Sequence, residues 1–138
     1  MLFRSTVQGH PISAQRLDNG NTLVALQQTQ KVVEVNSTGR VVWEIRTSGN
    51  PPWHAVRLEN GNTLITLTQA RKAVEYDPTG KTIVWSTQTP LINPYAAQRL
   101  ASGNTLVADH TGIHEFDPKG REVRLGFKQQ QVMGLSSF

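Results

Sequence analysis

The chain of 138 residues is long enough for one domain with a buried core, and its hydrophobic content of 37% favours many short, half-buried strands over thick helices. It contains no cysteine, which excludes disulfide bonds and thiolate metal sites. The net charge of +4 comes from scattered Lys and Arg residues with no run of four or more, so a nucleic-acid-binding surface is not expected.

Neither a signal peptide nor a membrane span is expected from the sequence. The first residues, Met1 to Gly9, lack the apolar run of a signal peptide. No stretch approaches the roughly 20 apolar residues that cross a membrane, so no membrane span is expected. As it stands the chain is predicted to be cytoplasmic, or periplasmic or extracellular if an export signal has been removed.

Three copies of one nine-residue pattern organise the chain. The copies are RLDNGNTLV at 16–24, RLENGNTLI at 57–65 and RLASGNTLV at 99–107. The central glycines of successive copies lie 41 and 42 residues apart. A constant period of this length indicates supersecondary units that stack on one another.

Each repeat contains four short runs rich in Val, Ile, Thr, Trp and Leu, which predict β-strands. The expected strands are Ile12–Leu17, Thr22–Leu26, Val32–Asn36, Val41–Arg46, Trp53–Leu58, Thr63–Leu67, Ala73–Asp77, Thr82–Ser86, Tyr95–Leu100, Thr105–Ala108, Ile113–Asp117 and Glu122–Phe127. Residues 2–9 are interpreted as the end of an earlier strand, and residues 128–138 as an irregular or weakly helical tail.

Turn signals separate these runs. Asn19-Gly20 and its counterparts follow the first run of each repeat and predict a type I′ hairpin turn with positive φ at both positions. Asn36–Gly39, Asp77–Gly80 and Asp117–Gly120 follow the third run and have the residue preferences of a type I turn. A meander of four antiparallel strands repeated about every 40–50 residues is typical of a propeller blade.

The pattern Arg-Leu-x-Asn-Gly-Asn-Thr-Leu-Val, then Val-x-Glu-x-Asp-Pro-x-Gly, then Val-Trp, resembles the repeats of bacterial propellers of the pyrroloquinoline-quinone-like and arylsulfotransferase-like superfamily. The resemblance covers about residues 10–127. It implies an all-β propeller fold in a single repeat domain. The expected blades are blade one at about 10–50, blade two at about 51–92 and blade three at about 93–127, with a tail at 128–138.

Trp43 and Trp85 extend this resemblance, because each follows a turn glycine by four or five residues as in the tryptophan-docking motif of quinoprotein blades. That motif implies that the tryptophan braces neighbouring blades, and repeat three has Arg124 in its place. The quinone cofactor itself is not implied, because the family's site needs a vicinal cysteine pair. We therefore expect no cofactor.

Three blades do not make a closed ring, since propellers close with about 4–8 blades. A three-blade arc would expose an apolar sheet face at each end, which monomers rarely carry. We therefore expect a homodimer in which blade one of each chain packs on blade three of the other, giving six blades and two equivalent interfaces. The alternative is a fragment of a longer propeller.

The first strand of each blade is expected to line the central channel, with its start near one mouth, where propellers bind ligands. Alignment of the repeats places Trp53 and Tyr95 at equivalent positions there. The candidate binding residues are Trp53, His54, Tyr95, Arg16, Arg57 and Arg99.

The arginines that recur once per repeat have two interpretations. Six of them in a closed ring could hold a small anionic ligand. Glu34, Glu75 and Glu115 also recur once per repeat. Because the arginine and the glutamate recur with the same period, the pattern indicates an ion pair that stabilises the blades. We favour the structural interpretation.

The histidines do not predict a catalytic site or a metal site. His54 resembles a histidine that arylsulfotransferase-like repeats often have before the first strand, but its equivalents are Ser13 and Ala96 and no nucleophile or acid–base group accompanies it. His110 and His114 lie with Asp109 around the shortened hairpin of repeat three. No further ligand is evident, so no metal site is predicted.

The sequence therefore favours a non-enzymatic propeller scaffold that self-associates and binds a protein, a peptide or a small anionic ligand at the channel mouth. Two alternatives stay open. One is a sulfotransferase-like or lyase-like enzyme, or half-enzyme, that uses His54 and the channel arginines. The other is a propeller fragment with no ligand.

Overall fold

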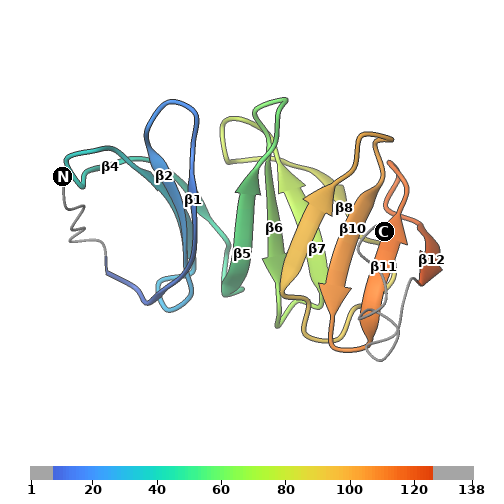
Figure 1. The fold of residues 1–138 in the computed structure, drawn as a ribbon. Coiled ribbons are helices and arrows are strands. Elements are labelled where there is room, and N and C mark those ends of the chain that lie inside the picture. Colours follow the sequence, from blue (N-terminus) through green and yellow to red (C-terminus); the bar gives the residue numbers. More distant parts are fainter. Residues whose placement is uncertain (1–7, 126–138) are drawn as a thin grey trace, which may run out of the picture.

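Three four-stranded antiparallel sheets stand side by side in the computed structural model, which describes residues 8–125 (Figure 1). Within these residues there is no helix, and hence none that is long and apolar enough to cross a membrane. In every sheet the strands lie in chain order, so each sheet is a meander. Its first and fourth strands form the two edges.

All twelve strands that the repeats predict are present. Their bounds are β1 Pro11–Arg16, β2 Thr22–Leu26, β3 Lys31–Val35, β4 Val41–Arg46, β5 Pro52–Arg57, β6 Thr63–Leu67, β7 Lys72–Tyr76, β8 Ile83–Ser86, β9 Ala96–Arg99, β10 Thr105–Asp109, β11 Gly112–Phe116 and β12 Glu122–Leu125. The expected earlier strand at 2–9 and the tail at 128–138 lie outside the described residues, except for Gln8 and Gly9, which are not in a strand. We refer to β1–β4, β5–β8 and β9–β12 as sheets one, two and three.

The hairpin after the first strand of each sheet is not the type I′ turn that Asn19-Gly20 predicts. Gly20 has a φ of 90°, whereas Asn19 is not at positive φ. The N–H of Gly20 donates to the carbonyl of Leu17 (3.0 Å), and the N–H of Leu17 donates to the carbonyl of Asn21 (2.8 Å). The turn therefore begins at Leu17, and the glycine supplies the left-handed bulge residue at its end.

Two clusters of buried apolar side chains join the sheets. The cluster between sheets one and two contains Leu23, Ala25, Val32, Ile45, Ala55, Ile65, Leu67, Val74 and Tyr76. The cluster between sheets two and three contains Leu64, Ala73, Leu91, Ala97, Val107 and Phe116. Strand β6 is buried along its whole length because its alternate residues, such as Leu64 and Ile65, face a neighbouring sheet on each side.

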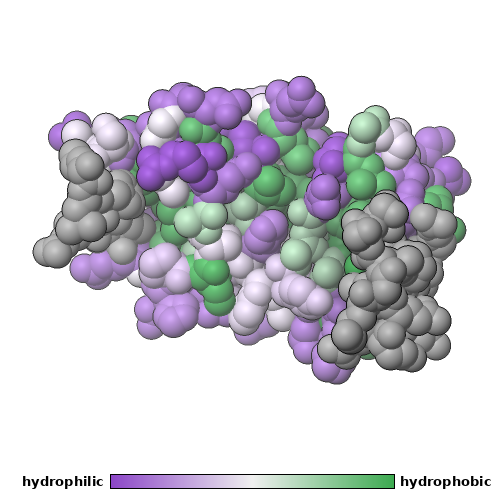
Figure 2. Space-filling view, viewed as in Figure 1, coloured by the Kyte–Doolittle hydropathy of each residue, from purple (hydrophilic) through white to green (hydrophobic). Residues whose placement is uncertain are grey.

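Figure 2 shows hydrophilic side chains mainly along the upper and lower edges of the arc, where the turns lie, and hydrophobic ones mainly between them. This distribution follows from the stacking of the sheets, because their apolar faces meet and their turns stay at the surface. The innermost strands provide many of the contacts between sheets: β5 packs on β1 and β2, and β9 packs on β5 and β6.

The two ends of the arc differ. Strand alternation places Leu106, Ala108 and Ile113 on the face of sheet three that points away from sheet two, and these side chains are half-buried. On the corresponding outer face of sheet one, Val24, Leu26, Val33 and Val35 form a third cluster and are at most 9% exposed. The expectation of an exposed apolar face at both ends is therefore wrong for sheet one, where these side chains are already buried.

The type I turns predicted between the third and fourth strands are confirmed. The N–H of Gly120 donates to the carbonyl of Asp117 (2.9 Å), and the Asp117 carboxylate accepts the N–H groups of Lys119 and Arg121. Gly120 has a φ of 82°, and a Cβ added there would lie 1.9 Å from the carbonyl oxygen of Ser86 at the end of β8. The turn glycine thus lets sheet three approach sheet two closely.

We predict that Gly120→Ala lowers the free energy of unfolding more than Gly103→Ala. Both glycines have positive φ, so both substitutions introduce backbone strain of about 1 kcal/mol. Only at position 120 does the new methyl group also collide with backbone, which adds about 1–3 kcal/mol. Urea denaturation of both variants measures the difference, and equal losses would contradict the close approach.

Candidate functional site

The innermost strands β1, β5 and β9 position the six candidate residues. Arg16, Arg57 and Arg99 are the last residues of these strands. Trp53 and His54 lie within β5, and Tyr95 directly precedes β9. The side chains of Trp53 and Tyr95 are 38% and 48% exposed, whereas His54 is half-buried.

Each of two arginines reaches back to a glutamate on the preceding sheet. Arg57 of sheet two lies 3.2 Å from the carboxylate of Glu34 in sheet one, and Arg99 of sheet three pairs with Glu75 of sheet two. The Nε atom of Arg57 also donates to the hydroxyl of Thr63 (3.0 Å), which fixes the direction of the guanidinium. The structural interpretation of these arginines, as ion pairs that build the blades, is confirmed at both junctions.

The Gly-Asn-Thr part of the repeat motif serves the same pair. The side-chain amides of Asn21 and Asn62 donate to Glu34 and Glu75, each at 2.7 Å. Burial would raise the pKa of Glu34, but hydrogen bonds from asparagine side chains and the charge of Arg57 outweigh it and lower the pKa. The Glu34 carboxylate is therefore ionised at neutral pH in the folded protein.

A tryptophan completes each junction. The guanidinium carbon of Arg57 lies 4.6 Å from the ring centroid of Trp43, and that of Arg99 lies 5.7 Å from Trp85. The indole N–H of Trp43 donates to the carbonyl of Pro78 in the next sheet (3.1 Å). That of Trp85 likewise donates to Asp117 (3.2 Å), so the expected bracing role of both tryptophans is confirmed.

We call this arrangement the interblade cluster: an arginine from one blade with the glutamate, asparagine and tryptophan of the preceding blade. It occurs twice within the described chain, as Arg57 with Glu34, Asn21 and Trp43, and as Arg99 with Glu75, Asn62 and Trp85. Arg57 and Arg99 are therefore engaged within the protein. An anion that bound either guanidinium would compete with a carboxylate.

His54 borders a groove on the outer side of sheet three. The groove has a volume of about 410 Å³ and is lined by His54, Ala96, Ala97, Gln98, Leu106, Ala108 and Ile113. The Nδ1 atom of His54 is buried and has no hydrogen-bond partner within the described residues. Burial lowers the pKa of this imidazole, so at neutral pH it is uncharged and can offer a hydrogen bond but not a positive charge.

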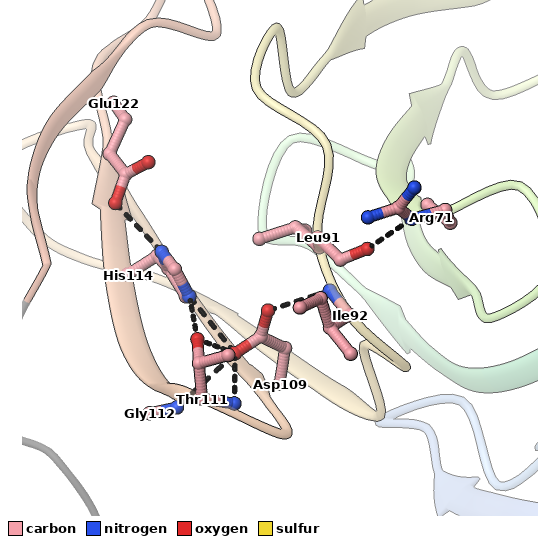
Figure 3. A network of polar contacts seen from close by, with 8 residues as sticks. All are labelled: Arg71, Leu91, Ile92, Asp109, Thr111, Gly112, His114 and Glu122. Carbon is pink, nitrogen blue, oxygen red and sulfur yellow. Dashed lines mark hydrogen bonds and ion pairs between the residues drawn. The ribbon is translucent and has the colours of Figure 1, made fainter.

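A buried polar network in sheet three was not foreseen as a unit (Figure 3). The Nδ1 atom of His114 lies 2.7 Å from the Glu122 carboxylate, and its Nε2 atom lies 2.9 Å from Asp109 and 3.0 Å from the hydroxyl of Thr111. Both ring nitrogens are thus used inside the protein. Within the described residues, no group of three or more His, Cys, Asp or Glu side chains is arranged so that it could hold a metal ion.

The network is indicated in the sequence by polar residues of repeat three at positions that are apolar in the other two repeats. Asp109 stands at the position of two buried leucines in the other repeats, and His114 stands at that of two buried valines. Polar side chains at two core positions of one repeat need each other as partners. Asp109 also accepts the N–H of Ile92 (2.8 Å), so the network ties the connection between sheets two and three to the β10–β11 hairpin.

No protein-family model matches the sequence, and no curated protein matches it significantly. Among solved structures, a streptogramin B lyase matches 94% of this chain over 45% of its own length, with a TM-score of 0.73 and 15% identity. The WD40 β-propeller domain of Doa1 matches 86% over 41% of its length, with a TM-score of 0.72 and 10% identity.

A protein of unknown function from Bacteroides caccae matches 83% of the chain over 44% of its own length, with a TM-score of 0.64 and 26% identity. These likenesses, together with the three meander sheets, show a β-propeller fold. They do not confirm the superfamily that the repeats resemble. The chain spans less than half the length of these structures.

We predict strong coupling between Arg57 and Glu34. Each single alanine substitution should lower the free energy of unfolding by about 2 kcal/mol, less than for a fully buried pair because Arg57 is partly exposed. A double-mutant cycle by urea denaturation should give a coupling of about 1 kcal/mol or more. The same cycle on the exposed pair of Arg46 and Glu44 within β4 serves as the control, and an equal coupling there would contradict the prediction.

We also predict that the Asp109 network makes the protein less stable in acid. Burial would raise the pKa of Asp109, but hydrogen bonds from Ile92 and Thr111 outweigh it and lower the pKa. The ionised carboxylate therefore contributes stability above its unfolded pKa of about 4, and this contribution is lost as the pH falls through the lower folded pKa.

Asp109→Asn should thus reduce stability at pH 7 and flatten its decline in acid. Urea denaturation across a pH series measures this, with Asp18→Asn at an exposed position of the first hairpin as the control. An unchanged acid slope in Asp109→Asn would show that the network does not depend on the charge.

Proposed function

We propose that the protein is a non-enzymatic propeller scaffold that closes its ring by self-association, with blade one of each chain packed on blade three of the other. The observation that carries this proposal is the outer face of sheet three. Leu106, Ala108 and Ile113 occupy the positions that Leu23, Ala25 and Val32 occupy in sheet one. The latter are fully buried under sheet two. In sheet three these positions are half-buried and line the His54 groove.

The opposite end of the arc supplies a matching surface. The outer face of sheet one repeats the face with which sheet two packs on sheet one. In sheet two that face is formed by Ile65, Leu67, Val74 and Tyr76, and the equivalent residues of sheet one are Val24, Leu26, Val33 and Val35. A second copy therefore carries an apolar face of the right pattern for sheet three. These four side chains are already buried in the single chain. On association they would therefore lose their present contacts and pack on sheet three of the other chain instead.

In a two-fold dimer the outer face of sheet one packs on the outer face of sheet three of the other chain, and this contact occurs twice. The two chains would then form six blades, and both end sheets of each chain would be covered. Propellers with this number of blades are within the usual range of about 4–8. The length comparison supports the same idea, since one chain spans less than half of the propeller structures it matches.

At the channel mouth we propose binding of a protein or peptide segment through Trp53 and Tyr95. Both aromatic side chains are exposed and lie at equivalent places on neighbouring blades. Exposed aromatic rings are effective anchors for polypeptide partners. A small anionic ligand is the weaker candidate, because Arg57 and Arg99 are paired with glutamates and burial lowers the pKa of His54.

A lyase-like or sulfotransferase-like enzyme is the second candidate, and His54 is the observation that favours it. A neutral imidazole with an unpaired Nδ1 beside a groove could act as a base. Among the described residues no carboxylate orients this ring, which argues for the scaffold. Turnover of an aryl sulfate that disappears in His54→Ala would support the enzyme, and undiminished turnover in that variant would exclude His54 as its base.

We predict a solution mass of twice the 15.3 kDa chain, measured by multi-angle light scattering after size exclusion. The two equivalent interfaces should keep this mass constant over a tenfold dilution, since they act together. A mass of one chain would overturn self-association. A mass well above two chains would overturn the closed two-fold ring.

A further inference from the structure

We propose that self-association places Arg16 of each chain on Glu115 of the other, so that both junctions between the chains reproduce the ion pair of the interblade cluster. This inference rests on the proposed self-association. The Arg16–Glu115 pair is the polar contact that sets the register of the two chains. Its template is the pair of junctions inside the chain, where the arginine always reaches the glutamate of the preceding blade.

The backbone places Glu115 like the other two glutamates. In the strand register Glu115 faces Leu106, just as Glu34 faces Leu23 and Glu75 faces Leu64. Its carboxylate is therefore on the outer face of sheet three, beside the groove where the next blade would pack. The amide of Asn104 donates to this carboxylate at 2.8 Å, as the equivalent asparagines do in sheets one and two.

The backbone also places Arg16 like the other two arginines. Arg16 faces Thr22 in the register, as Arg57 faces Thr63 and Arg99 faces Thr105. It ends β1, and its guanidinium donates to the carbonyl of Gly20 (2.8 Å) in the single chain. Arg16 is exposed, and the proposed pairing requires its guanidinium to exchange its contacts in the single chain for a carboxylate on another chain.

The junction between chains has one difference from those within the chain. Repeat three has Arg124 where the other repeats have a tryptophan. The junction therefore lacks the indole N–H donor and the aromatic ring on which Arg57 and Arg99 lie. The strand register places Arg124 opposite Glu115, as Trp43 and Trp85 stand opposite Glu34 and Glu75. Arg16 would therefore join a carboxylate that already has an arginine opposite it in its own chain. The junction between chains is thus more highly charged than those within the chain, and the dimer should weaken as salt is added.

A charge-exchange experiment tests the pairing. Arg16→Glu puts two like charges at both junctions of its own homodimer, and Glu115→Arg does the same with the opposite sign. Each variant should raise the dissociation constant of the homodimer by at least about tenfold relative to wild type. Sedimentation or light scattering over a concentration series measures this constant.

Mixing the two variants should restore association. In the mixed dimer, the glutamate introduced at position 16 of one chain meets the arginine introduced at position 115 of the other. The second junction joins the native Arg16 and Glu115. The chain that carries both Arg16→Glu and Glu115→Arg should likewise dimerise with itself. The control Lys81→Glu makes the same change of charge in the exposed β7–β8 turn of sheet two, the middle sheet, and should leave the dissociation constant unchanged.

The outcomes separate the pairing from self-association itself. If wild type is a single chain, the proposed self-association is overturned. If wild type is a dimer but the single variants associate as well as wild type, or the mixture and the double variant do not recover, the Arg16–Glu115 pairing is overturned while self-association stands. Should a single variant fail to fold by circular dichroism, Arg16→Gln and Glu115→Gln replace it, and each should still weaken the dimer.

Discussion

The arginine–glutamate pair across the blade boundary is the constraint on which the rest of the structure depends. The side chains of Glu34 and Glu75 are only 10% and 6% exposed, so their carboxylates cannot rely on water. A buried carboxylate is costly unless it is both charge-paired and hydrogen-bonded. The arginine of the next blade supplies the charge, and the asparagine of the same blade supplies the hydrogen bond. Blades one and two are therefore incomplete until the following blade is in place.

This dependence explains why the nine-residue motif keeps so many polar positions. The glycine ends the turn with a left-handed residue, the asparagine holds the glutamate, and the threonine hydroxyl accepts from the arginine. The arginine then lies on the preceding tryptophan. Residues that look like a binding loop thus build the junction. His54 and the Asp109–His114–Glu122 network depart from the repeat and are not part of the junction.

Much of the fold was predictable, because each repeat brings its own strands and turns close together in sequence. The strand runs and the type I turn at Asp117–Gly120 are local features of this kind. The first hairpin was misassigned because Asn-Gly usually signals a type I′ turn, whereas here the hydrogen bonds of Leu17 set the turn one residue earlier. The contact of His114 with Glu122 depends on the register of β11 and β12, which local sequence does not specify.

By itself the sequence determined the period, the strands and the presence of one arginine and one glutamate in every repeat. Only the tertiary structure decided that an arginine pairs with the glutamate of the preceding blade. It also decided that the tryptophan N–H reaches a carbonyl of the following one. The physical reason is that these partners lie more than twenty residues apart and meet only when two sheets stack face to face. Spacing along the chain reveals that such groups recur, but the distance between them depends on how the sheets pack.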